Sequence, residues 1–279
     1  MFRSEGLAET QDYGGASVAV ERLCYVSKGM VLHSEDPDGR AHFAKDDLIS
    51  DVPDARHPKR FMEGKHMAKW VVRRLRYLEY GTKRAPALCS RPTFPEIYEV
   101  PEKLIAMDIS GGEARVAHDD RQLFHNHSAW SFAPWHSLAG VRNRSIQKTA
   151  RYRDEVRHGE TPPGGVFREE LEELSRQFAL KYVLAVMNST FARDWLATRR
   201  RSKIHVYPDD WKPLPIAPIP LEEQQHFVKL VDAILAEFAT HGYPLPAEAA
   251  TRVAELEREI DERVAGLYGP SRVLETREV

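Results

Sequence analysis

The chain has 279 residues, of which 42% are hydrophobic and 29% charged, and its formal net charge is −2. This composition excludes a disordered chain and predicts a globular protein large enough to bury a core. The apolar runs are short and broken by charges, and the first residues lack an apolar signal core, so we expect a cytoplasmic protein without a membrane span. Cys24 and Cys89 are too few for a disulfide framework, and we expect both to be reduced thiols.

The first half of the chain predicts a β-rich domain. Residues 1–17 are small and polar and are interpreted as a linker remnant, and residues 34–54 have the composition of a loop. Alternating or β-branched segments predict strands at Val18–Val20, Leu23–Leu32, Lys69–Tyr80 and Gln122–Phe132, with a turn or bulge at 27–29 and a hairpin that joins Lys103–Ile109 to Ala114–His118 around Gly111-Gly112.

The second half predicts helices and one proline-rich connector. Apolar spacing indicates helices at Arg168–Phe178, Phe178–Trp195, from Leu221 onward and at Ala247–Tyr268, and a short strand at Ile204–Tyr207. Prolines between Pro208 and Pro220 favour an extended brace without helix. In the helix from Leu221, Phe227 and Ile234 belong to the apolar face, and Gln224 is assigned to the polar face.

The charges are segregated along the chain. Residues 56–91 hold 11 Lys or Arg and two acids, whereas residues 222–263 hold 10 acids and four bases. The net charge therefore does not exclude a nucleic-acid partner, because the local potential decides what a surface attracts.

Several motifs in the second half resemble one family. They are Lys181-Tyr-Val-Leu-Ala-Val-Met-Asn-Ser-Thr-Phe191, Tyr207-Pro-Asp-Asp-Trp-Lys-Pro-Leu-Pro-Ile216 and Leu221-Glu-Glu-Gln-Gln-His-Phe-Val-Lys-Leu-Val-Asp-Ala-Ile-Leu235, with further matches at Phe61–Lys65, Arg91–Glu96 and Leu256–Gly269. In this order and spacing they resemble the TaqI-like carboxy-terminal specificity domain of adenine-specific DNA methyltransferases and of combined restriction-and-modification enzymes. The resemblance covers most of the chain from about residue 23 onward.

The resemblance implies a function in DNA recognition. A domain of this family docks in the major groove of double-stranded DNA, while a methyltransferase domain binds S-adenosylmethionine and flips the target adenine. That catalytic half has no counterpart in this sequence: no glycine-rich cofactor turn follows a predicted strand, and Thr161-Pro-Pro-Gly164 lacks the polar residue and the aromatic ring of an adenine-holding tetrapeptide. We therefore expect no methyl transfer by the chain alone, and a partner methyltransferase subunit or domain, with a nuclease as a further possible component.

Basic segments are the candidate DNA-binding surface. Lysine and arginine neutralise phosphates, and arginine can also bind guanine with two hydrogen bonds. The candidate residues are Lys65, Lys69, Arg73, Arg74, Arg76, Tyr80, Arg91, Arg142, Arg144, Arg199, Arg200, Arg201 and Lys203. In a strand, Arg74 and Arg76 would share one face and Arg73 the other, which predicts base contacts for the first two and a structural or phosphate contact for Arg73.

Two alternatives remain open at this point. Pro213-Leu-Pro215 followed by Glu222-Glu-Gln-Gln225 also resembles the specificity subunit of a multi-subunit, type I-like restriction system. In a different class, Asp54, Glu63 and Lys65 satisfy the literal pattern of a magnesium-dependent nuclease, in which two carboxylates hold the metal. His125 and His127 are interpreted as hydrogen-bonded strand residues and not as metal ligands.

The sequence thus predicts an α+β protein with three parts. After the linker remnant, a curved, mostly antiparallel β domain at residues 18–165 would carry DNA recognition. A helical part at residues 166–279, braced by the proline-rich segment 208–220, would complete the chain. Because the chain begins without a catalytic half, we expect it to act as a fragment or as a separate subunit.

Overall fold

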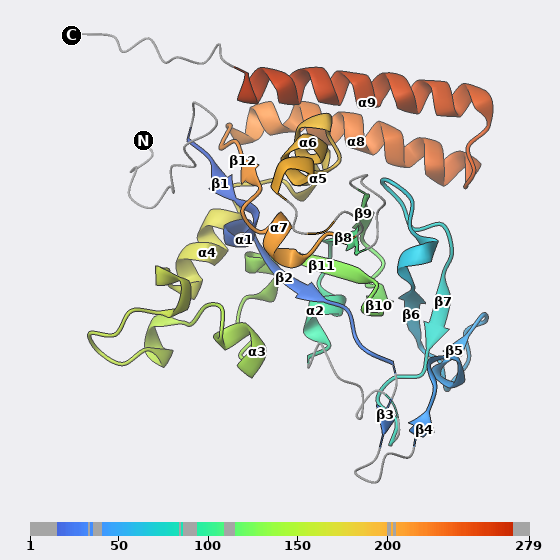
Figure 1. The fold of residues 1–279 in the computed structure, drawn as a ribbon, viewed down its shortest axis with the longest axis vertical. Helices are drawn as coiled ribbons and strands as arrows, with labels where there is room; N and C mark the ends of the chain where they lie inside the picture. The colour runs from blue at the N-terminus through green and yellow to red at the C-terminus, as the bar shows by residue number, and fades with distance from the viewer. Residues whose placement is uncertain are drawn as a thin grey trace.

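The computed structural model describes residues 16–32, 34–35, 41–83, 85, 94–108, 115–199, 202 and 205–269. They form a mixed α+β fold with long helices at the carboxy-terminal end (Figure 1). The strands are β1 (Val18–Ala19), β2 (Cys24–Lys28), β3 (Ser34–Glu35), β4 (Ala41–Phe43), β5 (Ile49–Ser50), β6 (Lys59–Met62), β7 (Arg76–Leu78), β8 (Lys103–Met107), β9 (Val116–Asp119), β10 (Phe124–His125), β11 (Ala129–Pro134) and β12 (Pro215–Ile216).

The helices are α1 (Val20–Leu23), α2 (Glu96–Glu99), α3 (Arg144–Gln147), α4 (Arg168–Ser175), α5 (Leu180–Met187), α6 (Thr190–Arg199), α7 (Pro208–Trp211), α8 (Leu221–His241) and α9 (Ala247–Tyr268). Short 3-10 turns are η1 (Lys45–Leu48), η2 (Gly64–His66), η3 (Trp135–Leu138), η4 (Arg153–Glu155) and η5 (Pro163–Gly165). None of the described helices is long and apolar enough to cross a membrane.

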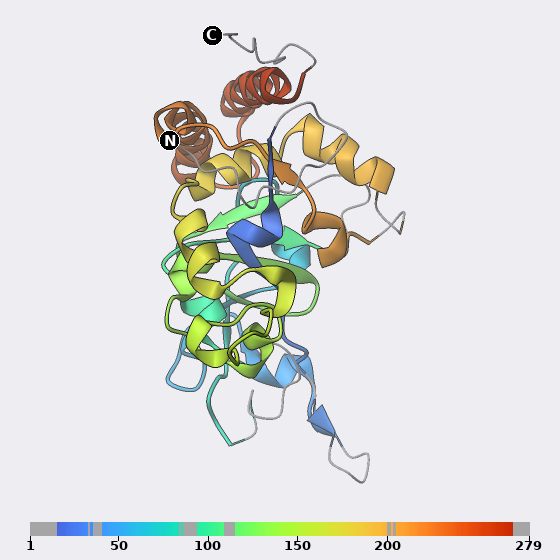
Figure 2. The same cartoon turned by 90° about the vertical axis from the view of Figure 1, so that its left-hand side faces the viewer.

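One antiparallel sheet lies at the centre of the molecule, with the order β2-β11-β8-β9. Its strands are buried on both faces because alternate residues enter different cores. In β8, Leu104 and Ala106 pack into the core shared with α5, α6, α8 and α9, whereas Ile105 packs into a core on the opposite side. Figures 1 and 2 show the long helices α8 and α9 beside one another at one end of the molecule.

A second sheet, ordered β10-β6-β7-β5, lies to the side of the first (Figure 1). Strands β6 and β7 are antiparallel, whereas β10 and β6 run parallel. Phe61 and Leu78 point into a core that also contains Tyr98 and Trp135. Because paired residues share a face, Arg60 and Tyr77, which lie directly opposite one another, occupy the other side of this sheet.

The helix predicted at Phe178–Trp195 is interrupted, so that expectation was wrong. Helix α5 ends at Met187 and α6 begins at Thr190. Between them, the Asn188 side chain is buried and makes two hydrogen bonds to Val116 of β9: its Oδ1 accepts from the backbone N at 3.0 Å, and its Nδ2 donates to the carbonyl at 2.8 Å. This contact with a distant strand ends the helix, and local spacing contains no signal for it.

Three further expectations in the second half need correction. The proline-rich brace contains helix α7, because Pro208 stands at the first helical position, where a missing N–H has no consequence. Gln224 is buried, since its amide donates to the carbonyls of Gln177 and Ile219 while its oxygen accepts from Ala179 N. Only part of the strand predicted at 204–207 lies within the described residues, and there His205 forms an isolated bridge.

In the first half, the predicted elements are broader than those observed. The predicted strand at residues 18–20 gives way to α1, and the turn expected at residues 27–29 is incorrect because Ser27 and Lys28 pair with β11. The loop expected at 34–54 holds β3, β4, η1 and β5, and residues 126–128 separate β10 from β11. The predicted hairpin is confirmed by the β8–β9 pairing, although its turn at 109–114 lies outside the described residues.

The two expected domains share a core. Strand β12 pairs antiparallel with β1, and the core that contains Leu104 and Phe132 also contains Val183, Phe227 and Val264. The linker at residues 1–15 lies outside the described part of the chain, and a boundary near Gly165 stays a prediction.

Candidate nucleic-acid interface

The basic segment Lys69–Tyr80 is mostly a loop, so the expected long strand was wrong. Only residues 76–78 form a strand, β7. Before it, a tight turn is closed by the hydrogen bond from Ala68 N to Val71 O at 2.9 Å, and Trp70 has a φ of 77°. That left-handed conformation is rare for a bulky residue and is incompatible with a strand. The Trp70 side chain is buried, and its Nε1 donates to Glu257 of α9 at 2.5 Å.

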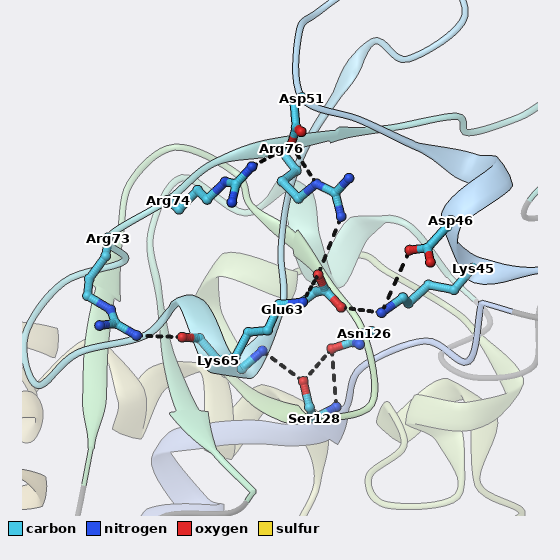
Figure 3. A network of polar contacts seen from close by, with 11 residues as sticks. Lys45, Asp46, Asp51, Glu63, Lys65, Arg73, Arg74, Arg76, Asn126 and Ser128 are labelled. Carbon is cyan, nitrogen blue, oxygen red and sulfur yellow. Dashed lines mark hydrogen bonds and ion pairs between the residues drawn. The ribbon is translucent and has the colours of Figure 1, made fainter.

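Arg74 and Arg76 share one partner, whereas Arg73 makes different contacts (Figure 3). Arg74 Nη2 and Arg76 Nε bind the same oxygen of Asp51, Oδ1, at 2.9 and 2.8 Å. Arg73 instead donates to the backbone carbonyl of Lys65, and its guanidinium lies 5.0 Å from the ring centroid of Tyr243, in the connection between α8 and α9. Arg73 thus joins the loop to the helical part.

A buried carboxylate lies beneath this loop. Glu63 follows β6, and its side chain is only 5% exposed. Lys45 Nζ lies 2.6 Å from Glu63 Oε1, whereas Lys65 Nζ and Arg76 Nη1 lie 3.2 and 3.6 Å from Oε2. Burial alone would raise the pKa of Glu63, but the hydrogen bonds and charges of Lys45 and Lys65 outweigh it and lower the pKa. Glu63 is therefore an anion that gathers three cations from three chain segments.

We define Lys45, Lys65, Arg74 and Arg76 as the cation cluster. Lys65 and Arg74 are its most exposed members, with 66% and 59% of their side chains accessible, whereas Arg76 is 17% exposed. Asp51 and Glu63 bind these cations closely, and Asp46 forms a longer ion pair with Lys45 at 3.9 Å (Figure 3). The two most exposed cations of the cluster, Lys65 and Arg74, are accessible from solvent.

Close packing at Gly64 fixes the backbone between Glu63 and Lys65. Gly64 N donates to Ser128 Oγ at 2.8 Å, and the Ser128 hydroxyl donates in turn to Asn126 Oδ1. A Cβ atom on Gly64 would lie 2.6 Å from Ser128 O and 2.8 Å from Ser128 Oγ, which is too close for any real contact. Glycine is required here for space, although its φ is not in the left-handed region.

We expect Gly64→Ala to lower the free energy of unfolding by about 1–3 kcal/mol, as other overpacked sites do. The same change would move Glu63 away from its cations, so any DNA affinity of the cluster should fall as well. Chemical denaturation and DNA titration measure the two effects. Gly266→Ala, at an open position on α9, is the matched control and should leave DNA affinity unchanged. Wild-type stability in the Gly64 variant would contradict the packing argument.

The other predicted site residues that the structure describes make contacts with residues outside the cation cluster. Lys69 Nζ is paired with Glu257 at 2.9 Å, and Tyr80 packs edge-on against Phe124. Arg142 binds Asp154 and Glu155, and its guanidinium lies over Tyr152. Arg144 is exposed in α3, and Arg199 lies over Trp195 at the end of α6. Arg91, Arg200, Arg201 and Lys203 lie outside the described residues.

Of the three residues of the proposed nuclease motif, Glu63 and Lys65 contact one another, whereas Asp54 makes separate contacts. Asp54 Oδ1 accepts from the backbone N of Arg56 and His57 at 2.8 Å, and it also binds the His57 ring. Glu63 is occupied by cations, as described above. Within the described ranges, no group of three or more His, Cys, Asp or Glu side chains is placed to hold a metal ion. His125 is buried and hydrogen-bonded, as expected, whereas His127 lies in a turn and not in a strand.

Sequence reasoning missed several residues of this region. Lys45 and Asp51 were assigned to a loop without a role, since only the tertiary fold brings them to Glu63 and Arg76. Arg60 and Tyr77 were also missed as a cross-strand pair. Two basic residues precede two apolar ones in Lys59-Arg60-Phe61-Met62, so the segment contains no alternation that would have indicated the outward face of Arg60.

No protein-family model and no curated protein matches this sequence. Solved structures do match it. The chain is similar to a chain of a type I R-M system, with 13% identity and a TM-score of 0.38, over 96% of this chain and 48% of that one. It is also similar to the type IIL restriction-modification enzyme MmeI, solved in complex with DNA, with 9% identity and a TM-score of 0.42, over 94% of this chain and 34% of the enzyme.

A third similar structure is the HsdS subunit from Thermoanaerobacter tengcongensis, with 13% identity and a TM-score of 0.36, over 96% of this chain and 47% of the subunit. The chain therefore spans less than half the length of each of these three proteins.

Proposed function

We propose that this chain is the DNA sequence-recognition module of a restriction-modification system, and that it works with an N6-adenine methyltransferase carried by another domain or subunit. The order of the motifs that resemble the TaqI-like specificity domain supports this proposal. The observation that carries it is the cation cluster, in which residues distant in sequence converge beside β7 with Lys65 and Arg74 exposed.

The chemistry of the cluster suits duplex DNA. Lysine and arginine neutralise backbone phosphates and release counterions, which supplies affinity without regard to sequence. Arginine can also form two hydrogen bonds to guanine in the major groove, and each such contact contributes about 1–3 kcal/mol of discrimination. Arg74 is the outward-facing arginine and has the base-reading role in this proposal. Arg76 is largely covered and supports it through their shared partner Asp51.

The proposal assigns the remaining parts accordingly. Residues 18–165 carry recognition, and residues 166–279 hold the recognition part in place through contacts such as Arg73 with Tyr243 and Trp70 with Glu257. S-adenosylmethionine would bind the methyltransferase partner and not this chain. Organisation as the specificity subunit of a type I-like system uses the same surface, and the Pro213-Leu-Pro215 and Glu222–Gln225 motifs favour it as a second candidate. Dependence of DNA binding on a separate methyltransferase chain would distinguish it.

A selection experiment tests the proposal without knowledge of the target. The purified chain, alone and with a methyltransferase subunit from the same operon if one exists, is incubated with random DNA duplexes, and bound duplexes are amplified over several rounds. We expect one short sequence to be enriched. Enrichment of no sequence in either condition would overturn the proposal.

The arginine variants are then compared on the enriched and on scrambled duplexes. We expect Arg74→Ala to lose affinity mainly for the enriched sequence, by about 1–3 kcal/mol, because a base contact is removed. Arg73→Ala should weaken binding to both duplexes about equally, since Arg73 holds the backbone of Lys65 and contacts Tyr243. Arg252→Ala is the matched control: Arg252 makes a two-bond ion pair with Glu237 between α9 and α8. Equal losses for Arg74→Ala on both duplexes would reduce the cluster to a phosphate-binding surface.

A further inference from the structure

We infer that the two carboxylates of the cation cluster act on DNA binding in opposite directions. Glu63 is a positioning residue that keeps Lys45, Lys65 and Arg76 in place for DNA. Asp51 occupies a phosphate site at Arg76, holds Arg74 through the same oxygen, and releases both arginines when DNA binds. This inference rests on the proposed function and adds to it an anion site and a self-blocking contact.

The burial of Glu63 supports its permanent role. Its side chain lies 5% exposed at the end of β6, with Lys45 at 2.6 Å and Lys65 at 3.2 Å. A buried carboxylate that left its cations would remain unpaired away from water, which is strongly unfavourable. The three cations reach Glu63 from η1, η2 and β7, so removal of its charge would leave like charges close together without an anion between them. Each cation would then swing into solvent.

The exposure of Asp51 supports the opposite role. Its side chain is 58% exposed, and a single oxygen receives both Arg74 Nη2 and Arg76 Nε. An exposed ion pair of this kind contributes little stability, so the contact can exchange. A DNA phosphate has two non-bridging oxygens that share one charge and can bind a guanidinium through two hydrogen bonds, whereas Asp51 offers a single oxygen to both arginines. DNA phosphate is therefore the expected replacement for Asp51 at Arg76, and its binding there frees Arg74 for the base contact that the proposed function assigns to it.

Three variants that each remove one negative charge separate local contacts from general electrostatics. They are Asp51→Asn, Glu63→Gln and the control Asp46→Asn. Asp46 lies in η1 with 82% of its side chain exposed, and its nearest cation, Lys45, is 3.9 Å away. Each variant is titrated at several salt concentrations with two DNA duplexes, one that carries the enriched sequence and one that carries a scrambled sequence. Thermal unfolding confirms that each variant is folded.

We expect Asp51→Asn to bind both duplexes about two- to five-fold more tightly than Asp46→Asn, because an exposed competing ion pair is removed. The salt dependence of DNA binding by Asp51→Asn should equal that of the wild type, since both proteins contact the same phosphates. Glu63→Gln should bind more weakly than wild type although it is less acidic, and its salt slope should fall by roughly one unit as a cation leaves the site. Glu63→Asp keeps the negative charge, so its salt slope should lie between those of Glu63→Gln and the wild type.

The outcomes distinguish this inference from the proposed function. Wild-type protein that enriches a sequence, together with Asp51→Asn binding no more tightly than Asp46→Asn, would overturn the displacement by phosphate and leave DNA recognition intact. Tighter binding by a folded Glu63→Gln variant would overturn the positioning role. If Glu63→Gln does not fold, Glu63→Asp decides, because its shorter side chain cannot reach all three cations and its salt slope should lie below that of the wild type. A slope equal to that of the wild type would overturn the role. Absence of DNA binding by the wild type would overturn both proposals.

Discussion

Replacing Lys103 by methionine is expected to destabilise the fold by about 3–5 kcal/mol, because it leaves a buried carboxylate without its cation. Lys103 and Asp119 are cross-strand partners in β8 and β9, and both side chains are fully buried. Lys103 Nζ donates to Asp119 Oδ2 at 2.5 Å and to the carbonyl of Tyr98 at 2.8 Å. Burial lowers the pKa of Lys103, while the charge of Asp119 opposes this shift.

Urea denaturation of two variants tests the Lys103 contact. The variant Lys103→Met alone leaves Asp119 with only the backbone donors of Arg121 and Leu123, each at 2.9 Å. The double variant Lys103→Met with Asp119→Asn removes both charges and should recover part of the loss, because the two changes are coupled. A loss below about 1 kcal/mol for the single variant would show that the carboxylate finds another compensation.

Acidification from neutral pH is expected to destabilise the fold through His125. Burial lowers the pKa of His125 to about 4, only partly offset by its hydrogen bond to the carbonyl of Asn126. That carbonyl can only accept, so Nδ1 carries the proton and Nε2 accepts from the Ser131 hydroxyl at 2.6 Å. The folded state therefore holds a neutral imidazole with both nitrogens satisfied.

The sign of the pH effect follows from the two protonation states. An unfolded chain has a histidine pKa of about 6.5, so between there and pH 4 the unfolded state binds more protons than the folded state. The contribution of His125 is present above pH 6.5 and decreases as the pH falls, by up to about 3 kcal/mol at pH 4. The free energy of unfolding, measured by denaturation at several pH values in this range, should fall more steeply with decreasing pH for the wild type than for His125→Gln. His226→Gln, at an exposed position of α8, is the control. Parallel curves for wild type and His125→Gln would contradict the assignment.

Local sequence signals predicted those elements whose shape is decided locally. The bounds of α9 and the start of α8 follow from a regular apolar spacing and from the prolines before each helix. The interruption at Asn188 and the burial of Gln224 were not predicted, because both depend on hydrogen bonds to residues distant in the chain. The loop at Trp70 escaped prediction for the same reason, since its turn is stabilised by a contact with α9.

The candidate site was predicted in part. Its basic character was expected from the charge pattern. The different contacts of Arg73 and Arg74 arise in a loop and not from the strand alternation on which the expectation was based. The two carboxylates were not expected to organise the cations, because Glu63 had been considered as part of a family match and of a nuclease motif, and Asp51 only as part of a loop. Charge density along a sequence indicates where cations occur, but their pairing depends on which segments the fold brings together.

The contacts between the basic loop and α9 couple the conformation of the loop to the position of that helix. Glu257 of α9 accepts from Trp70 Nε1 and pairs with Lys69, so the start of the loop is fixed by a helix from the opposite end of the chain. Whatever displaces α9 also changes the geometry presented by the loop. Thermodynamic reciprocity then requires that a subunit bound to the helix pair and a ligand bound to the loop alter each other's affinity by the same factor.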